Sequence, residues 1–155
     1  LGYNVAGYSD NYFAFGNASS DTVVPFGATN WSNPSDERFK KEITSSTAGL
    51  SFINDLRPVT FKWKNAGDVP SGLSGYIEGS TEPVMSGPFA TTTNHGFIAQ
   101  EVKTVVDNHS EIKDGFEMWA EDTTGRQRIA YGALVPMLTK AVQELSAKVT
   151  ALENA

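Results

Sequence analysis

The sequence contains no cysteine among its 155 residues. Disulfide-stapled scaffolds, thiolate zinc sites and cysteine nucleophiles are therefore excluded. Histidine is also scarce, because His95 and His109 are the only two, and no carboxylate lies at a recognised metal-ligand spacing from either one. The sequence has no P-loop, no GxGxxG motif and no GxSxG elbow. We therefore expect neither a metal centre nor any other cofactor.

Basic charge and long apolar runs are both limited. Twelve Lys and Arg face eighteen Asp and Glu, which gives a net charge of -6. A protein that binds a phosphate backbone needs the opposite balance, so nucleic acid is not an expected partner. No apolar run approaches the roughly 18 residues of a membrane span, and the first residues lack the pattern of a signal peptide. We expect a soluble protein that has no membrane partner.

Charge divides the chain near residue 35. Residues 1–34 contain no Lys or Arg and are rich in glycine and aromatic residues, with short strand-like patches at 12–15 and 22–24 that turn residues separate. Such patches predict short β-strands that cannot form a core alone. The chain begins with Leu rather than Met, so we expect it to be a piece of a longer polypeptide, in which 1–34 ends an upstream β-rich segment.

The remainder of the chain mixes helical and strand patterns. Helices are predicted from Ser35 over 35–43, after a cap at Ser46 or Thr47 up to Pro58, and along a segment that contains Val102 and Val106. Residues 59–64 alternate as a strand, and 116–131 read as a hairpin. Between them, 65–94 is rich in Gly, Pro, Ser and Thr and is typical of a long loop or an insertion. These patterns predict an α+β fold.

The C-terminal segment 134–155 has the strongest periodicity in the chain. Val and Leu alternate at spacings of three and four for nearly three heptads, so that Val occupies the a positions and Leu the d positions. One interpretation is an amphipathic helix that docks on its own domain, and the other is a coiled coil between chains. We expect oligomerisation, because the last turns have little else to pack against. The predicted contact residues are Val135, Leu138, Val142, Leu145, Val149 and Leu152.

The segment from Ser35 to Ile43 carries the only candidate chemistry that we find in the sequence. One interpretation is that Ser35 is a helix cap followed by a solvated turn. The other is a serine nucleophile with a lysine base, which requires the amine to be neutral. A lysine with the ordinary pKa of about 10.4 is almost entirely charged near neutral pH. Nearby positive charge from Arg38, or exclusion of water by Phe39 or an oligomer interface, would favour the neutral amine.

Four motifs in order resemble one known family. The chain from Ser35 to its end is similar to the endosialidase-type C-terminal intramolecular chaperone domain, which ends many phage tail spikes, tail fibres and neck appendages. A relative occurs in the myelin regulatory factor. The matching motifs are S-D-x-R-x-K-x-x-I (Ser35, Asp36, Arg38, Lys40, Ile43), F-x-W (Phe61, Trp63), G-F-I-A-Q-E-V (96–102) and Y-x-x-L-x-P-x-L (Tyr131, Leu134, Pro136, Leu138).

The resemblance implies a homotrimeric chaperone that assists folding of an upstream fibre or spike and then releases itself by serine-lysine autoproteolysis. By the same resemblance the cut falls between Pro34 and Ser35, with Ser35 as nucleophile and Lys40 as general base. Asp36 and Arg38 would have supporting roles. The implied domains are the fibre end 1–34, the chaperone and autoprotease 35–133 with an insertion at 65–94, and the trimerisation helix 134–155.

The implied role also fixes an expected location. The chain would assemble in the host cytoplasm, after which the fibre portion stays on the virion tail and the chaperone is released. The alternative is a non-enzymatic trimerisation or receptor-binding tip, in which Ser35 only caps a helix. A hydrolase for a separate substrate is disfavoured, because no substrate pocket is evident in the sequence.

Overall fold

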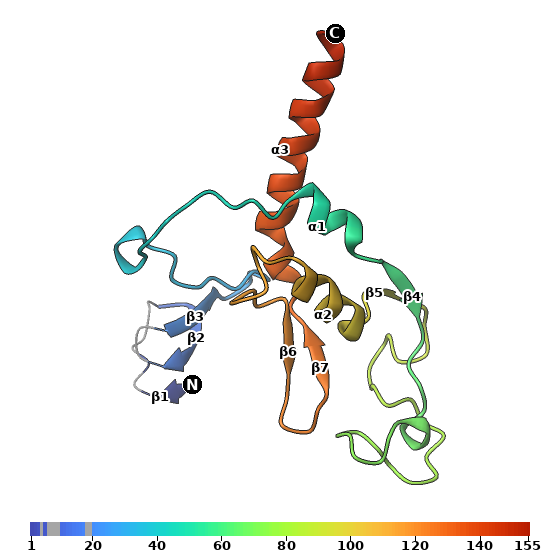
Figure 1. The fold of residues 1–155 in the computed structure, drawn as a ribbon. Coiled ribbons are helices and arrows are strands. Elements are labelled where there is room, and N and C mark those ends of the chain that lie inside the picture. The colour runs from blue at the N-terminus through green and yellow to red at the C-terminus, as the bar shows by residue number, and fades with distance from the viewer. Residues whose placement is uncertain (4, 6–9, 18–19) are drawn as a thin grey trace. The chain divides into compact units, whose positions relative to one another are not determined.

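The strand-like patches at the start of the chain form a small sheet. The structure, a computed structural model, describes residues 1–3, 5, 10–17 and 20–155. Strand β1 (Gly2–Tyr3) pairs in parallel with β2 (Tyr12–Asn17), which pairs antiparallel with β3 (Ser20–Pro25). The two strands predicted at 12–15 and 22–24 are thus confirmed, each slightly longer than its pattern. In Figure 1 they are the blue arrows that follow the N-terminus.

The predicted helix over residues 35–43 is wrong. Only one turn of 3-10 helix forms, η1 (Glu37–Phe39), and its N-cap is Asp36 rather than Ser35. Lys40 is already extended, with φ −113° and ψ 148°, and Glu42 adopts a left-handed φ of 56°. A helix cannot pass through either conformation, so good helix formers here do not produce a helix.

The chain divides into two compact units, Leu1–Ser45 and Ser46–Ala155. The first holds the β1–β2–β3 sheet and η1, and the second holds all remaining elements. The domain boundaries predicted after residues 34 and 133 differ from this division by packing, and they stay predictions.

Three helices surround the core of the second unit: α1 (Leu50–Asp55), α2 (Ala99–Asn108) and α3 (Leu134–Glu153). Phe52 and Met118 are fully buried, and Val102 is nearly so. Apolar residues of α1 and α2 thus meet the hairpin and the start of α3 around one cluster. Its buried members are Ala48, Phe52, Leu56, Val102, Val106, Ile112, Met118 and Leu134.

Two antiparallel strand pairs complete this unit. Strand β4 (Val59–Phe61) pairs with β5 (Asn94–Gly96), and β6 (Trp119–Glu121) pairs with β7 (Gln127–Ile129). The predicted hairpin and α+β class are therefore confirmed. The stretch between β4 and β5 consists mostly of turns and contains one short 3-10 helix, η2 (Ala66–Asp68). Another 3-10 helix, η3 (Tyr131–Ala133), precedes α3.

Helix α1 begins without a side-chain cap of its own. Its N-cap is Gly49, so the predicted caps at Ser46 and Thr47 are wrong. The Leu50 N–H instead donates a hydrogen bond of 2.9 Å to the carboxylate of Glu144, which lies on α3. A carboxylate at a helix N-terminus satisfies a free N–H and complements the helix dipole. Tertiary packing thus supplies the cap that the local sequence lacks.

Candidate active site

Ser35 and Lys40 lie on either side of the η1 turn. Two backbone hydrogen bonds close this turn, from Phe39 N–H to the Asp36 carbonyl and from Lys40 N–H to the Glu37 carbonyl. The turn reverses the chain, and the Lys40 Nζ lies 2.6 Å from the Ser35 Oγ. This is the distance at which an amine can take a proton from a serine hydroxyl. Both predicted catalytic side chains are therefore brought together by a local turn.

Asp36 and Arg38 shape the same turn. The Asp36 carboxylate accepts from the Arg38 backbone N–H at 2.9 Å and from the Arg38 guanidinium through Nε and Nη2. The Arg38 guanidinium, helped by the backbone N–H, holds the pKa of Asp36 below its ordinary value. The pair therefore stays charged and caps η1. No described hydrogen bond joins either residue to Ser35 or Lys40, so their contribution is to the path of the chain.

Lys41 is oriented differently from its neighbour. Its ammonium lies 3.8 Å from the Glu42 carboxylate, and both side chains are almost fully exposed. Because the backbone at Lys40 is extended, neighbouring side chains there are expected on opposite sides of the chain. Of the two lysines, only Lys40 lies within hydrogen-bond distance of Ser35.

Ser35 and Lys40 are both exposed in the single chain. On the other side of Ser35, Pro34 lines a hollow of about 410 Å³, whose other lining residues are Ser20, Asp21, Thr22, Asn33 and Phe39. The peptide bond between Pro34 and Ser35 is thus open to water. The site thus places a serine hydroxyl and a lysine amine within reach of each other, next to a peptide bond that water can approach.

The apolar stripe predicted for trimerisation lies uncovered on α3. The exposed fractions run from 45% for Leu138 to 78% for Leu152. A different face of the helix packs on the domain, through buried Leu134 and Ala141 and the Glu144 contact with Leu50. Docking on its own domain therefore does not account for the stripe. Residues Val135, Leu138, Val142, Leu145, Val149 and Leu152 are all exposed. The C-terminal part of α3 also extends away from the rest of the second unit (Figure 1).

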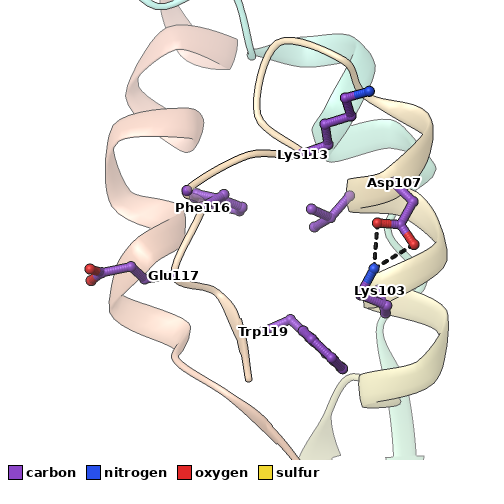
Figure 2. Close-up of a pocket in the computed structure, with 8 residues that line it drawn as sticks. Lys103, Asp107, Lys113, Phe116, Glu117 and Trp119 are labelled. Atoms are coloured by element: carbon purple, nitrogen blue, oxygen red, sulfur yellow. Dashed lines mark hydrogen bonds and ion pairs between the residues drawn. The ribbon is translucent and has the colours of Figure 1, made fainter. Parts of the chain in front are cut away.

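Hollows in the second unit have a different chemistry. Figure 2 shows one between α2 and the segment before β6, where Lys103 contacts both carboxylate oxygens of Asp107 and lies 5.1 Å from the centre of the Trp119 ring. A second hollow of about 620 Å³ contains Trp63 and Tyr131 among its lining residues. Neither hollow includes a serine, so the serine-lysine pair of the first unit has no counterpart in these two hollows.

His109 is buried and links two helices. Its Nε2 lies 2.9 Å from Asp55 at the end of α1, and its Nδ1 lies 2.9 Å from Glu111. These hydrogen bonds, that with Glu111 first, raise the pKa of His109 above its ordinary value. The Phe52 ring contacts the imidazole edge to face, with ring centres 5.4 Å apart. The histidine thus joins structural elements. The described residues contain no group of His, Asp and Glu suited to a metal, and no described helix is long and apolar enough to cross a membrane.

Comparison with known proteins gives one match. The model of the family described as the chaperone of endosialidase, a peptidase family, matches residues 35–111. The match begins at the serine of the candidate site and extends through α1, β4, β5 and α2. No curated protein and no solved structure matches the chain. Residues 35–111 are therefore consistent with the domain of the chaperone of endosialidase family.

Proposed function

We propose that this chain is a C-terminal intramolecular chaperone that trimerises, assists folding of a phage tail fibre or spike, and then cuts itself between Pro34 and Ser35. The family match supports the chaperone role. The observation that carries the cleavage is the 2.6 Å separation of Lys40 Nζ and Ser35 Oγ. In this proposal the chain is a serine autoprotease that acts once, with no cofactor.

The chemistry is an acyl shift followed by hydrolysis. Neutral Lys40 takes the Ser35 hydroxyl proton while Oγ attacks the carbonyl carbon of Pro34. The C–N bond then breaks, and Lys40 returns the proton to the Ser35 nitrogen. An ester between Pro34 and Ser35 Oγ remains, together with a free Ser35 amine. Water adds to the ester and releases the Pro34 carboxyl group and the Ser35 hydroxyl, so that one water is consumed for one peptide bond.

Trimerisation supplies what the single chain lacks at this site. Lys40 is exposed to water in the single chain, and a serine-lysine pair needs a neutral amine. Burial beside another chain favours the neutral form. The exposed stripe of α3, with Val at a and Leu at d, is suited to bring chains together. We therefore infer that the base becomes active only in the homotrimer.

The chaperone role follows from the folding problem of a β-fibre. Fibres built from contacts between chains nucleate slowly and expose unpaired strand edges while they fold. Three joined C-termini make the later pairing effectively intramolecular and set its register. Cleavage then removes the folding aid and leaves the fibre kinetically trapped. We place assembly in the host cytoplasm, with the fibre retained on the virion tail and the chaperone released.

The deciding experiment compares wild type with Ser35→Ala and Lys40→Ala by denaturing gel and intact-mass spectrometry. The proposal expects residues 1–34 and 35–155 as separate products in the wild type only. An intact wild-type chain in a trimeric sample would overturn autoproteolysis. The exposed α3 stripe would then favour the alternative function, a non-enzymatic trimerisation or receptor-binding tip.

A further inference from the structure

The three residues before the proposed cut are each anchored to the β1–β2–β3 sheet. The anchors are of three kinds: a stack of aromatic rings, a pair of backbone hydrogen bonds, and a hydrogen bond between side chains. All three lie within the first unit. Their positions run consecutively through Trp31, Ser32 and Asn33, directly before Pro34.

Trp31 provides the aromatic anchor. Its ring packs edge-on against Phe13 and Phe15 of β2, with ring centres 5.9 and 5.2 Å apart. Phe13 and Phe15 share one face of the strand because side chains alternate. This contact fixes the position of Trp31, and hence of the chain that leads to Pro34, on the exposed face of β2.

Ser32 provides the backbone anchor. It forms an antiparallel bridge with Val23 on β3, in which Val23 N–H donates to the Ser32 carbonyl at 2.9 Å and Ser32 N–H donates to the Val23 carbonyl at 2.8 Å. Strand β3 pairs with β2 along one edge and with Ser32 along the other. A strand added to a sheet edge is a common way to bind an extended peptide.

Asn33 provides the side-chain anchor. The Thr22 hydroxyl donates a hydrogen bond of 2.6 Å to the Asn33 side-chain carbonyl. Thr22 lies on β3 beside Val23, so this bond continues the backbone bridge by one residue toward Pro34. The hollow beside Pro34 is lined by Thr22 and Asn33 as well, which places the anchor next to the bond to be cut.

We propose that the outer edge of β3, which binds Ser32 and Asn33, and the face of β2 that binds Trp31 together form an internal substrate-binding surface, so that the Pro34 carbonyl is presented to Ser35. This inference rests on the proposed autoproteolysis. Thr22, Trp31 and Asn33 are then positioning residues that touch the chain beside the reacting atoms. Cleavage requires β2 and β3 to be folded, so the cut reports that the end of the upstream segment has reached its native structure.

The physical basis is the geometric demand of an acyl transfer. The nucleophile must approach the carbonyl within about 3–3.5 Å and along a narrow direction, and a displacement of about 1 Å slows such reactions by around a hundredfold. A free Pro34 carbonyl samples many directions relative to Ser35. Anchoring the three preceding residues removes this freedom before the reaction begins.

The test measures the first-order cleavage rate of the full chain after cell-free synthesis. Thr22→Val keeps the branched shape of the side chain but removes the hydrogen-bond donor. We expect a cleavage rate about tenfold lower, which corresponds to the free energy of one hydrogen bond. Asn33→Leu removes the acceptor and should slow cleavage similarly, whereas Asn33→Asp keeps an acceptor and should restore the rate. Trp31→Ala should slow cleavage by around a hundredfold, and Trp31→Phe less.

The control is Thr60→Val, the same change at an exposed position of β4 in the other sheet, which should leave the rate unchanged. Circular dichroism and sedimentation check that each variant is folded and has the wild-type oligomeric state. If the folded Thr22→Val and Asn33→Leu chains are cut within about twofold of the wild-type rate, the β3 edge has no positioning role, although autoproteolysis stands. An uncut wild-type chain would remove both proposals.

Discussion

Lys40 and Ser35 are five residues apart in sequence, and their side chains meet at 2.6 Å across a single 3-10 turn. The pair forms without help from any distant segment, because two backbone hydrogen bonds close the turn between them. The Ser35–Lys40 pair is thus a local structure, whereas the trimer and the β-sheet that we propose to activate it and to present its substrate depend on contacts between distant segments.

The two adjacent lysines allow a matched test of the base. We expect Lys40→Ala to abolish cleavage, because the only amine near Ser35 Oγ among the described residues is lost. Lys41→Ala removes the same charge from the same segment but leaves that contact, and cleavage should continue at the wild-type rate. Intact-mass spectrometry of both variants checks this. Loss of cleavage in both would point to net charge rather than to a base.

The cap of η1 should control the cleavage rate without abolishing it. Asp36→Ala removes the acceptor for the Arg38 N–H that caps η1, so we expect a rate roughly fivefold lower. Asp36→Asn keeps the acceptor and loses the exposed ion pair, which contributes little. The rate of Asp36→Asn should stay near that of the wild type, as measured by gel densitometry over time. Equal decreases of the cleavage rate in both variants would show that Asp36 acts through its charge rather than as a hydrogen-bond acceptor.

The exposed stripe of α3 should hold the oligomer together. Val142→Lys or Leu145→Lys places a charge at an a or d position, and we expect monomers in place of trimers, together with loss of cleavage. Gln143→Lys adds the same charge to a neighbouring exposed position outside the stripe and should leave the trimer intact. Light scattering after size-exclusion chromatography measures the mass. Efficient cleavage by a monomer would contradict activation through the trimer.

His109 should make the stability of the second unit dependent on pH. The pKa of His109 in the folded chain is raised above its ordinary 6.5. The contribution of His109 to the free energy of unfolding is therefore complete below pH 6.5 and is lost as the pH rises through the folded-state pKa. The pKa of Glu111 is lowered from 4.5 by His109, so stability also falls as the solution becomes strongly acidic. We expect a melting temperature higher at about pH 6 than at about pH 8.

Two histidine variants test this pH dependence by calorimetry. His109→Gln should remove most of the difference in melting temperature between the two pH values, since the imidazolium that pairs with Asp55 and Glu111 is lost. His95→Gln alters an exposed histidine of β5 and should preserve the difference. A wild-type melting temperature that does not change between these conditions would show that the ion pairs of His109 contribute nothing to stability.

The contact between Glu144 and Leu50 should stabilise the packing of α3 on α1. Glu144→Ala leaves the Leu50 N–H without its partner and removes the ion pair with Lys140, and we expect a loss of about 1–2 kcal/mol in the free energy of unfolding. Glu144→Gln keeps an acceptor and should lose less. Urea denaturation measures the difference, with the exposed Glu153→Ala as control. Equal stability of Glu144→Ala and Glu153→Ala would contradict the capping role.

The sequence by itself determined the features that depend on near neighbours. Strand-like patches beside turn residues predicted β2, β3 and the β6–β7 hairpin. The heptad spacing predicted α3, because side chains on one face of a helix recur at fixed intervals. The motif from Ser35 to Ile43 identified the two residues that the structure places in contact. Local pattern failed at 35–43, where capping and helix-forming residues predicted a helix, but the extended Lys40 and left-handed Glu42 end it after one turn.

Only the tertiary structure decided the relationships between distant residues. No spacing in the sequence indicates that Ser32 pairs with Val23, that Asn33 meets Thr22, or that Glu144 caps the helix that starts at Leu50. The heptads show which α3 residues are apolar, but packing decided that Leu134 and Ala141 face the domain and left the stripe exposed. Such pairings depend on how separate segments fill a common core and satisfy each other's backbone groups, which is a property of the whole fold.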